Sequence, residues 1–245
     1  MRVMIMHKTN AHWEGGAVPT PELVSRVGAL IAELSGARIL AGAEGLRASS
    51  QGVRVSFEGG VATVRKGPLP GENELPERFS IVRTGSVDEA VEWAERQAAE
   101  LGDGEVDIRP VTEAWDIGLA PPPADVVRRR YLVLRKATPA SEAGASLSPP
   151  QRTAMARLVE ETGRSGVHLT SETLRPSRRG RRYKNSINGV TVTDGPFTES
   201  KEMIGGYVIL IVGSWDEADG WARRYLAVVD ADEVDLRELD VPATA

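Results

Sequence analysis

The feature that most constrains the fold is an internal repeat, because the chain matches itself at an offset of 128 positions. At this offset Gly67-Pro68 falls on Gly195-Pro196, and Glu105-Val106-Asp107 falls on Glu233-Val234-Asp235. The alignment continues without a gap over most of the 245 residues. A single constant offset over this length does not arise by chance. It predicts two copies of one structural unit.

The repeat also places the domain boundaries. We expect a first unit at residues 1–118, a linker at 119–127 and a second unit at 128–245. The linker contains Pro121-Pro122-Pro123. A proline run cannot continue a helix or enter a central strand, so it is typical of a semi-rigid spacer.

Composition excludes several classes of protein. The chain is 41% hydrophobic and 27% charged, which is typical of a globular protein. It has no long apolar run, so we expect no membrane span, and its first residues read as a strand rather than a signal peptide. The absence of cysteine excludes disulfides and thiolate chemistry and fits the cytoplasm. A net charge of −5 gives no reason to expect nucleic acid.

Each unit predicts the same order of elements, β-α-β-β-β-β-α-β. Thr20-Pro21 begins an amphipathic helix, and Ser148, Ser86 and Ser214 each begin a helix with a capping-box pattern. Asn188-Gly189 is the strongest hairpin signal in the chain. The predicted strands of the first unit are 2–6, 39–41, 52–57, 61–64, 79–82 and 105–108. The predicted strands of the second unit are 131–134, 167–169, 183–187, 190–193, 207–212 and 233–236. These elements predict an α+β fold with helices on one face of an antiparallel sheet.

Residues 193–202, Thr-Asp-Gly-Pro-Phe-Thr-Glu-Ser-Lys-Glu, place three acidic side chains and one lysine around a turn. Gly195-Pro196 predicts a turn, since glycine tolerates positive φ and proline fixes its own φ. This stretch is either a solvated structural turn or a site. The first unit has Lys66-Gly67-Pro68-Leu69 here, so the two units keep the turn and differ in charge.

The motif resembles the signature of the YCII-related, or DGPF-domain, family. Asp194-Gly195-Pro196-Phe197, the following residues to Glu202, and Gly205-Gly206-Tyr207 carry the resemblance. It implies a ferredoxin-like unit of the dimeric α+β barrel type. Two covalently joined copies would then pack as an intramolecular pseudo-dimer, with a pocket between or within the units.

Three residues are candidates for catalysis. His7 directly follows the first strand, where it is either a general base or a histidine packed at the sheet edge. His168 and Asp194 are a candidate base and orienting carboxylate, and the resemblance implies a His–Asp pair in some family members. His7 with His12 lacks a third ligand at a recognisable spacing, so we predict no metal site. No phosphate loop or dinucleotide fingerprint is present, so we predict no cofactor.

Seven further residues are candidates for binding a ligand. Glu44 with Arg47, and Glu172 with Arg175, recur in both units after a short strand. Each pair is either a clamp for a carboxylate or an ion pair that fixes the loop. The remaining candidates are Lys66, Lys201 and Glu202.

A basic cluster is the last feature of the sequence. Its members are Arg175, Arg178, Arg179, Arg181, Arg182 and Lys184. It is an anion or nucleic-acid site, an exposed loop, or a surface that docks onto the acidic first unit. Because Tyr183 is the one aromatic residue within it, we do not expect nucleic acid.

Two functions remain open from the sequence. The first is a small-molecule enzyme that acts on a carboxylate- or lactone-type substrate by proton transfer, as the lyase and isomerase members of the wider barrel superfamily imply. The second is a non-catalytic ligand-binding or interaction module, since some DGPF relatives are joined to sigma factors. We expect the ligand to be a small anionic or carboxylate-type metabolite, and a further homodimer stays open.

Overall fold

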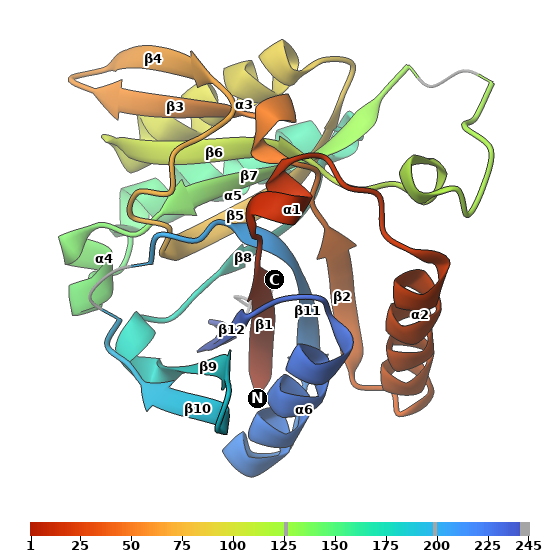
Figure 1. Ribbon diagram of the computed structural model, residues 1–245. Helices are drawn as coiled ribbons and strands as arrows, with labels where there is room; N and C mark the ends of the chain where they lie inside the picture. The colour runs from red at the N-terminus through yellow and green to blue at the C-terminus, as the bar shows by residue number, and fades with distance from the viewer. Residues whose placement is uncertain (125–126, 198–199, 241–245) are drawn as a thin grey trace.

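The computed structural model of the protein describes residues 1–124, 127–197 and 200–240. These residues form two six-stranded antiparallel sheets, with helices on the outer face of each (Figure 1). Sheet 1 has the order β10-β9-β12-β1-β11-β2, and sheet 2 has the order β4-β3-β6-β7-β5-β8.

The strand and helix bounds are as follows. Sheet 1 contains β1 (Arg2–Lys8), β2 (Leu40–Gly45), β9 (Gly180–Ser186), β10 (Gly189–Asp194), β11 (Ile204–Ile211) and β12 (Glu233–Glu238). Sheet 2 contains β3 (Val53–Glu58), β4 (Val61–Lys66), β5 (Pro76–Thr84), β6 (Gly104–Pro110), β7 (Arg129–Lys136) and β8 (His168–Thr173). The helices are α1 (Ala11–Glu14), α2 (Pro21–Gly36), α3 (Val87–Leu101), α4 (Pro139–Ala143), α5 (Pro149–Arg164) and α6 (Trp215–Val228). Short 3₁₀ turns are η1 (Ser49–Gln51), η2 (Ala114–Ile117) and η3 (Ser177–Arg179).

Each sheet takes strands from both halves of the chain. β1 lies between β11 and β12, so that Val3 is in register with both Leu210 and Glu238. β7 lies in the same way between β5 and β6 of the first half. The first half thus contributes β1 and β2 to sheet 1, whose other four strands come from the second half. The second half contributes β7 and β8 to sheet 2, whose other four strands come from the first half.

Three apolar layers hold the sheets and helices together. The outer face of sheet 1 packs on α2 and α6 through residues that include Val3, Leu34 and Leu226. The outer face of sheet 2 packs on α3 and α5 in the same manner (Figure 1). The inner faces meet in a cluster that includes Met4 and Phe79. Single bridges, Leu46 to Val111 and Leu174 to Leu239, join further segments where β2 and β8 end.

The helix starts follow from their capping residues. Thr20 accepts a hydrogen bond from the backbone N–H of Leu23, and Ser148 and Gln151 form a reciprocal capping box. Ser86 and Ser214 also cap as predicted, but the Glu89 and Glu217 carboxylates accept from Gly85 and Gly213, one residue before the cap. The described helices are too short or too polar to cross a bilayer.

Candidate functional site

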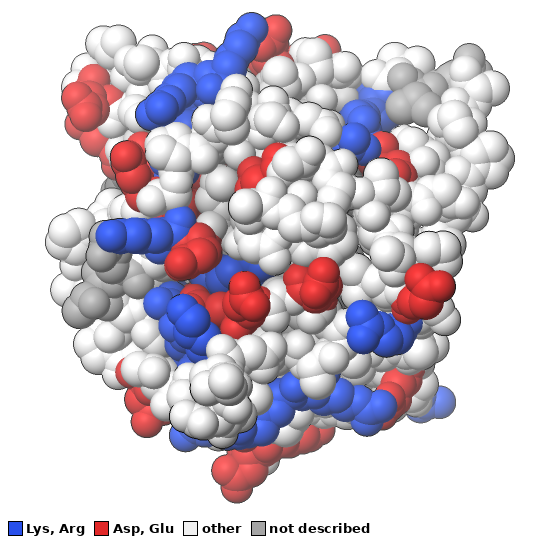
Figure 2. All heavy atoms as spheres, in the orientation of Figure 1, with Lys and Arg blue, Asp and Glu red and all other residues white. Residues whose placement is uncertain are grey.

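A cavity of about 440 Å³ lies between α2 and the outer face of sheet 1. Its wall is mostly apolar. The residues that form this wall are Leu23, Val24, Val27, Ile31, Ala43, Leu46, Ile117, Leu119, Val208 and Val229. Figure 2 shows mostly uncharged atoms between α1 and α2, with acidic side chains below them. The α2 residues that face the cavity are partly buried. Leu23, Val27 and Ile31 are spaced four residues apart, so they lie on the helix face that points toward the sheet.

His7 supplies a polar group to this wall. It is in register with Gly206 on β11, and its ring lies against Gly205-Gly206. A Cβ atom on Gly206 would lie 2.6 Å from His7 Cε1, and one on Gly205 would lie 2.9 Å from His7 Nε2. The two glycines are therefore the residues that leave room for an imidazole at this position.

The His7 ring is held by a tyrosine from α6. His7 Nδ1 lies 2.8 Å from the Tyr225 hydroxyl. Burial, with a smaller contribution from the Arg109 charge, lowers the pKa of His7 from 6.5 to about 4, so the ring is neutral at pH 7. Burial raises the pKa of Tyr225, so that hydroxyl keeps its proton. A hydroxyl that donates to Nδ1 leaves the proton of a neutral imidazole on Nε2.

An ion pair, Arg109 with Glu14, lies beside His7 in the cavity lining. The Arg109 guanidinium donates to the carbonyl oxygens of Arg47 and Ile204 and lies 3.2 Å from Glu14 Oε1. Its donors are thus engaged by the protein. Glu14, Glu44 and Asp230 outnumber Arg109 among the charged residues of the lining, so the cavity does not favour an anion.

The structure does not bring His168 and Asp194 together. His168 is on β8 in sheet 2, with Nε2 2.5 Å from Ser171 Oγ and its ring stacked on Trp93. Asp194 is on β10 in sheet 1, with its side chain 79% exposed and 3.0 Å from Arg181 Nε. They do not form the base and orienting carboxylate that the sequence suggested. His7 lies apart from both, at the cavity.

Glu44 and Glu172 lie within strands, because β2 and β8 extend further than their sequences predicted. Glu44 pairs with Arg130, and Glu172 pairs with Arg2, so each ion pair joins a strand of one sheet to a strand of the other. Burial raises the pKa of Glu44 despite its arginine partner.

Arg47 and Arg175 have partners other than these glutamates. Arg47 pairs with Asp116 and donates to Gln51. Arg175 lies 3.2 Å from Asp240. Of the two alternatives for these residues, the contacts favour ion pairs that fix the segments after β2 and β8, because both guanidinium groups already pair with carboxylates of the chain.

The stretch 193–202 packs closely on its surroundings, though residues 198 and 199 lie outside the described part of the chain. A Cβ atom on Gly195 would lie 1.9 Å from the carbonyl oxygen of Ser177, so only glycine fits. Ser177 Oγ accepts from the backbone N–H of Phe197, and Ser200 Oγ accepts from Lys8 Nζ. The predicted ligand residues Lys201 and Glu202 are exposed in this loop, and Lys66 is exposed at the end of β4.

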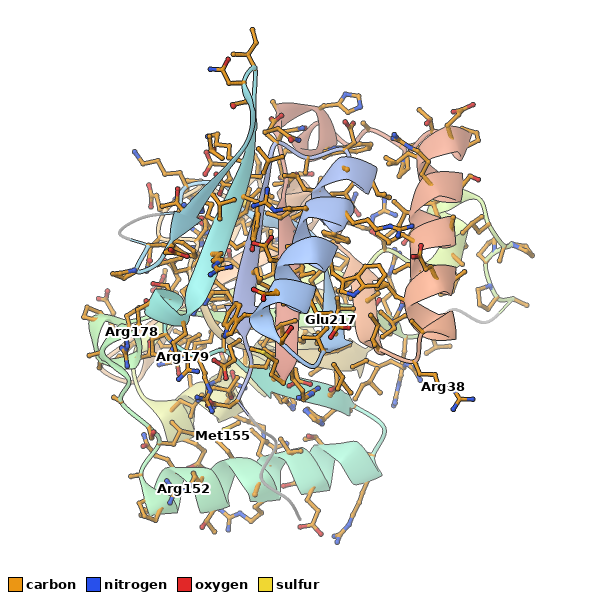
Figure 3. All side chains as sticks on the ribbon, turned by 90° about the horizontal axis from the view of Figure 1, so that it is seen from below. Arg38, Arg152, Met155, Arg178, Arg179 and Glu217 are labelled. Atoms are coloured by element: carbon orange, nitrogen blue, oxygen red, sulfur yellow. The ribbon has the colours of Figure 1, made fainter. Side chains whose placement is uncertain are left out.

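The basic cluster is largely paired within the second half of the chain. Arg179 pairs with Glu238, and Arg182 makes a two-pronged pair with Asp235. Figure 3 shows Arg178 and Arg179 close together and far from α2, and therefore away from the cavity. Glu238 and Asp235 both belong to the second half of the chain and not to the acidic first unit.

Sequence reasoning missed two kinds of residue. Tyr225 gave no signal, because a tyrosine in an amphipathic helix reads as core. Lys8 and Lys136 are buried, and each pairs with an aspartate or glutamate from the other half of the chain. Their identity at the 128-residue offset was a usable signal, since an isolated lysine is rarely buried without a partner. Among the described residues no group of three metal-binding side chains occurs.

Comparison with protein families gives a match in the second half of the chain. The family model of the YCII-related domain matches residues 129–234, which run from β7 into β12 and contain the Asp194-Gly195-Pro196-Phe197 turn. Comparisons with curated proteins and with solved structures give no match. Residues 129–234 are therefore a YCII-related domain.

Proposed function

We propose that this protein binds a small, mostly apolar molecule in the cavity between α2 and sheet 1, through a neutral acceptor oxygen such as a lactone carbonyl. The observation that carries the proposal is His7 at the wall of an apolar cavity, with Nδ1 bonded to Tyr225. In the tautomer in which the Tyr225 hydroxyl donates to Nδ1, Nε2–H is the donor available to the ligand. An anionic ligand is less suited, because Arg109 is already engaged and the other charged residues of the lining are acidic.

Proton transfer by His7 is the second candidate. The part-buried His7–Tyr225 contact favours it, since perturbed pKa values often mark catalytic groups. A base with a pKa of about 4, however, takes up a proton weakly at pH 7. The geometry therefore supports binding better than catalysis.

We also infer that the two halves are copies of one ferredoxin-like unit that exchange strands and pack as an intramolecular pseudo-dimer of the barrel type. The strand order β12-β1-β11-β2 recurs as β6-β7-β5-β8. Contacts recur at the same 128-residue offset, since Arg182 pairs with Asp235 as Arg54 pairs with Asp107. This arrangement supports units at 1–118 and 128–245 that share both sheets.

The test is titration calorimetry with a medium-chain lactone and with the carboxylate of equal chain length. We expect the lactone to bind the wild-type protein more tightly than the carboxylate. Ala43→Phe fills the cavity and should abolish lactone binding. His7→Leu removes the donor and should weaken binding by about tenfold, the loss of one hydrogen bond.

His168→Leu is the matched control, because His168 lies in sheet 2 outside the cavity lining. It should leave lactone binding unchanged. Equal binding by wild type and Ala43→Phe would place the ligand elsewhere and contradict the proposal. Lactone turnover that depends on His7, followed by NMR, would favour the second candidate.

A further inference from the structure

A second hollow, of about 470 Å³, lies beside the ends of β5 and β7 and the segment that contains η2. Its lining consists of Arg83, Glu113, Trp115, Val127, Arg128 and Arg130, and we call it the arginine hollow. Three arginines and one glutamate give it a positive balance, opposite to that of the cavity at His7. At the upper right of Figure 2 basic side chains gather on this part of the surface.

Two of these arginines oppose each other in the sheet. Arg83 on β5 is in direct register with Arg130 on β7. Like charges at such positions are destabilising, so an arrangement of this kind calls for a compensating charge. Arg130 has one, because its guanidinium donates to both carboxylate oxygens of Glu113 and also pairs with Glu44.

Arg83 and Arg128 have no such compensation. Within residues 1–124, 127–197 and 200–240 neither side chain makes an ion pair or a hydrogen bond. The carboxylate of Glu113 is bound by Nε and Nη2 of Arg130. The hollow therefore presents two guanidinium groups whose charges no described protein group balances.

The other half of the chain shows that the fold does not need this charge. At the 128-residue offset Arg130 corresponds to Arg2, which pairs with Glu172 in the same way as Arg130 pairs with Glu44. Arg83 corresponds to Ile211, which is in register with Arg2 and is 51% exposed. Strand β11 forms with the apolar Ile211 at this position, so strand β5 does not need the charge of Arg83 in order to form.

Trp115 adds a flat apolar surface to the same hollow. It lies on η2, whose position is fixed by ion pairs of Asp116 with Arg47 and Arg129. The backbone N–H of Glu113 also donates to Asp116, which ties the start of η2 to its end. An indole held in place beside guanidinium groups suits a ligand that joins an anion to an aromatic ring.

We propose that the arginine hollow binds a small aromatic carboxylate. Arg83 and Arg128 bind the carboxylate, and Trp115 covers the ring. Arginine matches a carboxylate with two parallel donors, and the ligand supplies the negative charge that Arg83 and Arg128 lack. This site is separate from the cavity at His7 and does not depend on the function proposed there.

The test is titration calorimetry at low ionic strength with benzoate, methyl benzoate and sulfate as probes. We expect benzoate to bind the wild-type protein, and methyl benzoate and sulfate to bind at least tenfold more weakly. Arg83→Gln should weaken benzoate binding by about tenfold or more, because it removes a charged hydrogen-bond donor. Trp115→Leu should weaken benzoate but not sulfate.

Arg65→Gln is the matched control, since Arg65 is exposed on β4 at the far edge of sheet 2 and the substitution removes the same charge. It should leave benzoate binding unchanged. Arg83→Gln should also raise the ligand-free melting midpoint by about 1 to 2 °C, because the like-charge pair is relieved. Absent benzoate binding, equal binding by Arg83→Gln, or sulfate binding as tight as benzoate would overturn the proposal.

Discussion

His7 is the residue whose surroundings have the clearest measurable effect. Its imidazole is buried beside Tyr225 and near the Arg109 charge, and its pKa falls to about 4 in the folded protein. In the unfolded chain the pKa returns to about 6.5. Between these values the unfolded chain binds a proton that the folded protein does not, so acid favours unfolding.

We predict that this difference shows as pH-dependent stability. From pH 7 to pH 5 the His7 contribution should lower the free energy of unfolding of the wild-type protein by about 2 kcal/mol. His7→Gln keeps an acceptor for Tyr225 and has no charge to gain, so it should lose this part of the pH dependence. Urea unfolding at both pH values measures it. An unchanged pH slope in the variant would show that His7 titrates normally in the folded state.

Single residues were predictable from the sequence where chemistry and position coincide. His7 could be found because it lies near the end of the first strand, although β1 extends past it to Lys8. Gly195 could be found because only a turn or a close approach requires glycine there. Partners were not predictable, since Glu44, one of the two acidic partners of Arg130, is on a strand from the other sheet. The sequence pairs residues by spacing, whereas the fold pairs Glu44 with an arginine 86 positions away.

At the scale of elements, β1 and β12 are joined by buried charge as well as by backbone hydrogen bonds. Lys8 on β1 lies 3.0 Å from Asp235 on β12, and both side chains are almost fully buried. Arg182 on β9 binds the same carboxylate with two donors. Burial alone would raise the pKa of Asp235, but Lys8 and Arg182 hold it below its ordinary value.

Removing this carboxylate charge should therefore be severe. We predict that Asp235→Asn lowers the free energy of unfolding by about 3 to 5 kcal/mol, because two cations lose their buried partner. Asp194→Asn is the control, since Asp194 is exposed on the edge strand β10 and should cost less than about 0.5 kcal/mol. Urea unfolding compares the two. Equal midpoints would mean that the buried ion pair contributes no more than the exposed one.

Elements with strong local signals were predicted well. The helices begin at Thr20, Ser86, Ser148 and Ser214 as the capping residues indicated. β2 runs further than predicted, through Leu-Ala-Gly-Ala-Glu-Gly, because pairing with β11 sustains residues of low strand propensity. α1 was missed, since its four residues are stabilised by Asn10, which accepts from His12 and Trp13.

For the whole molecule, the exchange of strands makes the two halves one folding unit. Each sheet takes four of its six strands from one half of the chain and needs the other half for the remaining two. We predict that a chain cleaved within 119–127 stays assembled and that its melting midpoint rises with protein concentration. The intact chain should melt at a midpoint independent of concentration, because its halves are joined. A separated half that unfolds cooperatively as a monomer would contradict this prediction.

The exchange could not be predicted from the sequence. Both halves have the same periodicity and similar strands, so β1 satisfies its local pattern equally well beside strands of either half. Only the long-range registers, such as Val3 with Leu210, distinguish the two pairings. Local sequence patterns thus predict strands and helices within each half but not which strands complete which sheet.

The covalent link between the halves has a consequence for how the chain can vary. In a pair of identical subunits, every substitution appears on both sides at once. Here one substitution changes one half alone. Arg83 corresponds to Ile211 at the 128-residue offset, and His7 corresponds to Arg135. One half can thus acquire a new binding residue while its counterpart preserves the original packing, so the positions that differ across the 128-residue offset point to where the molecule has specialised.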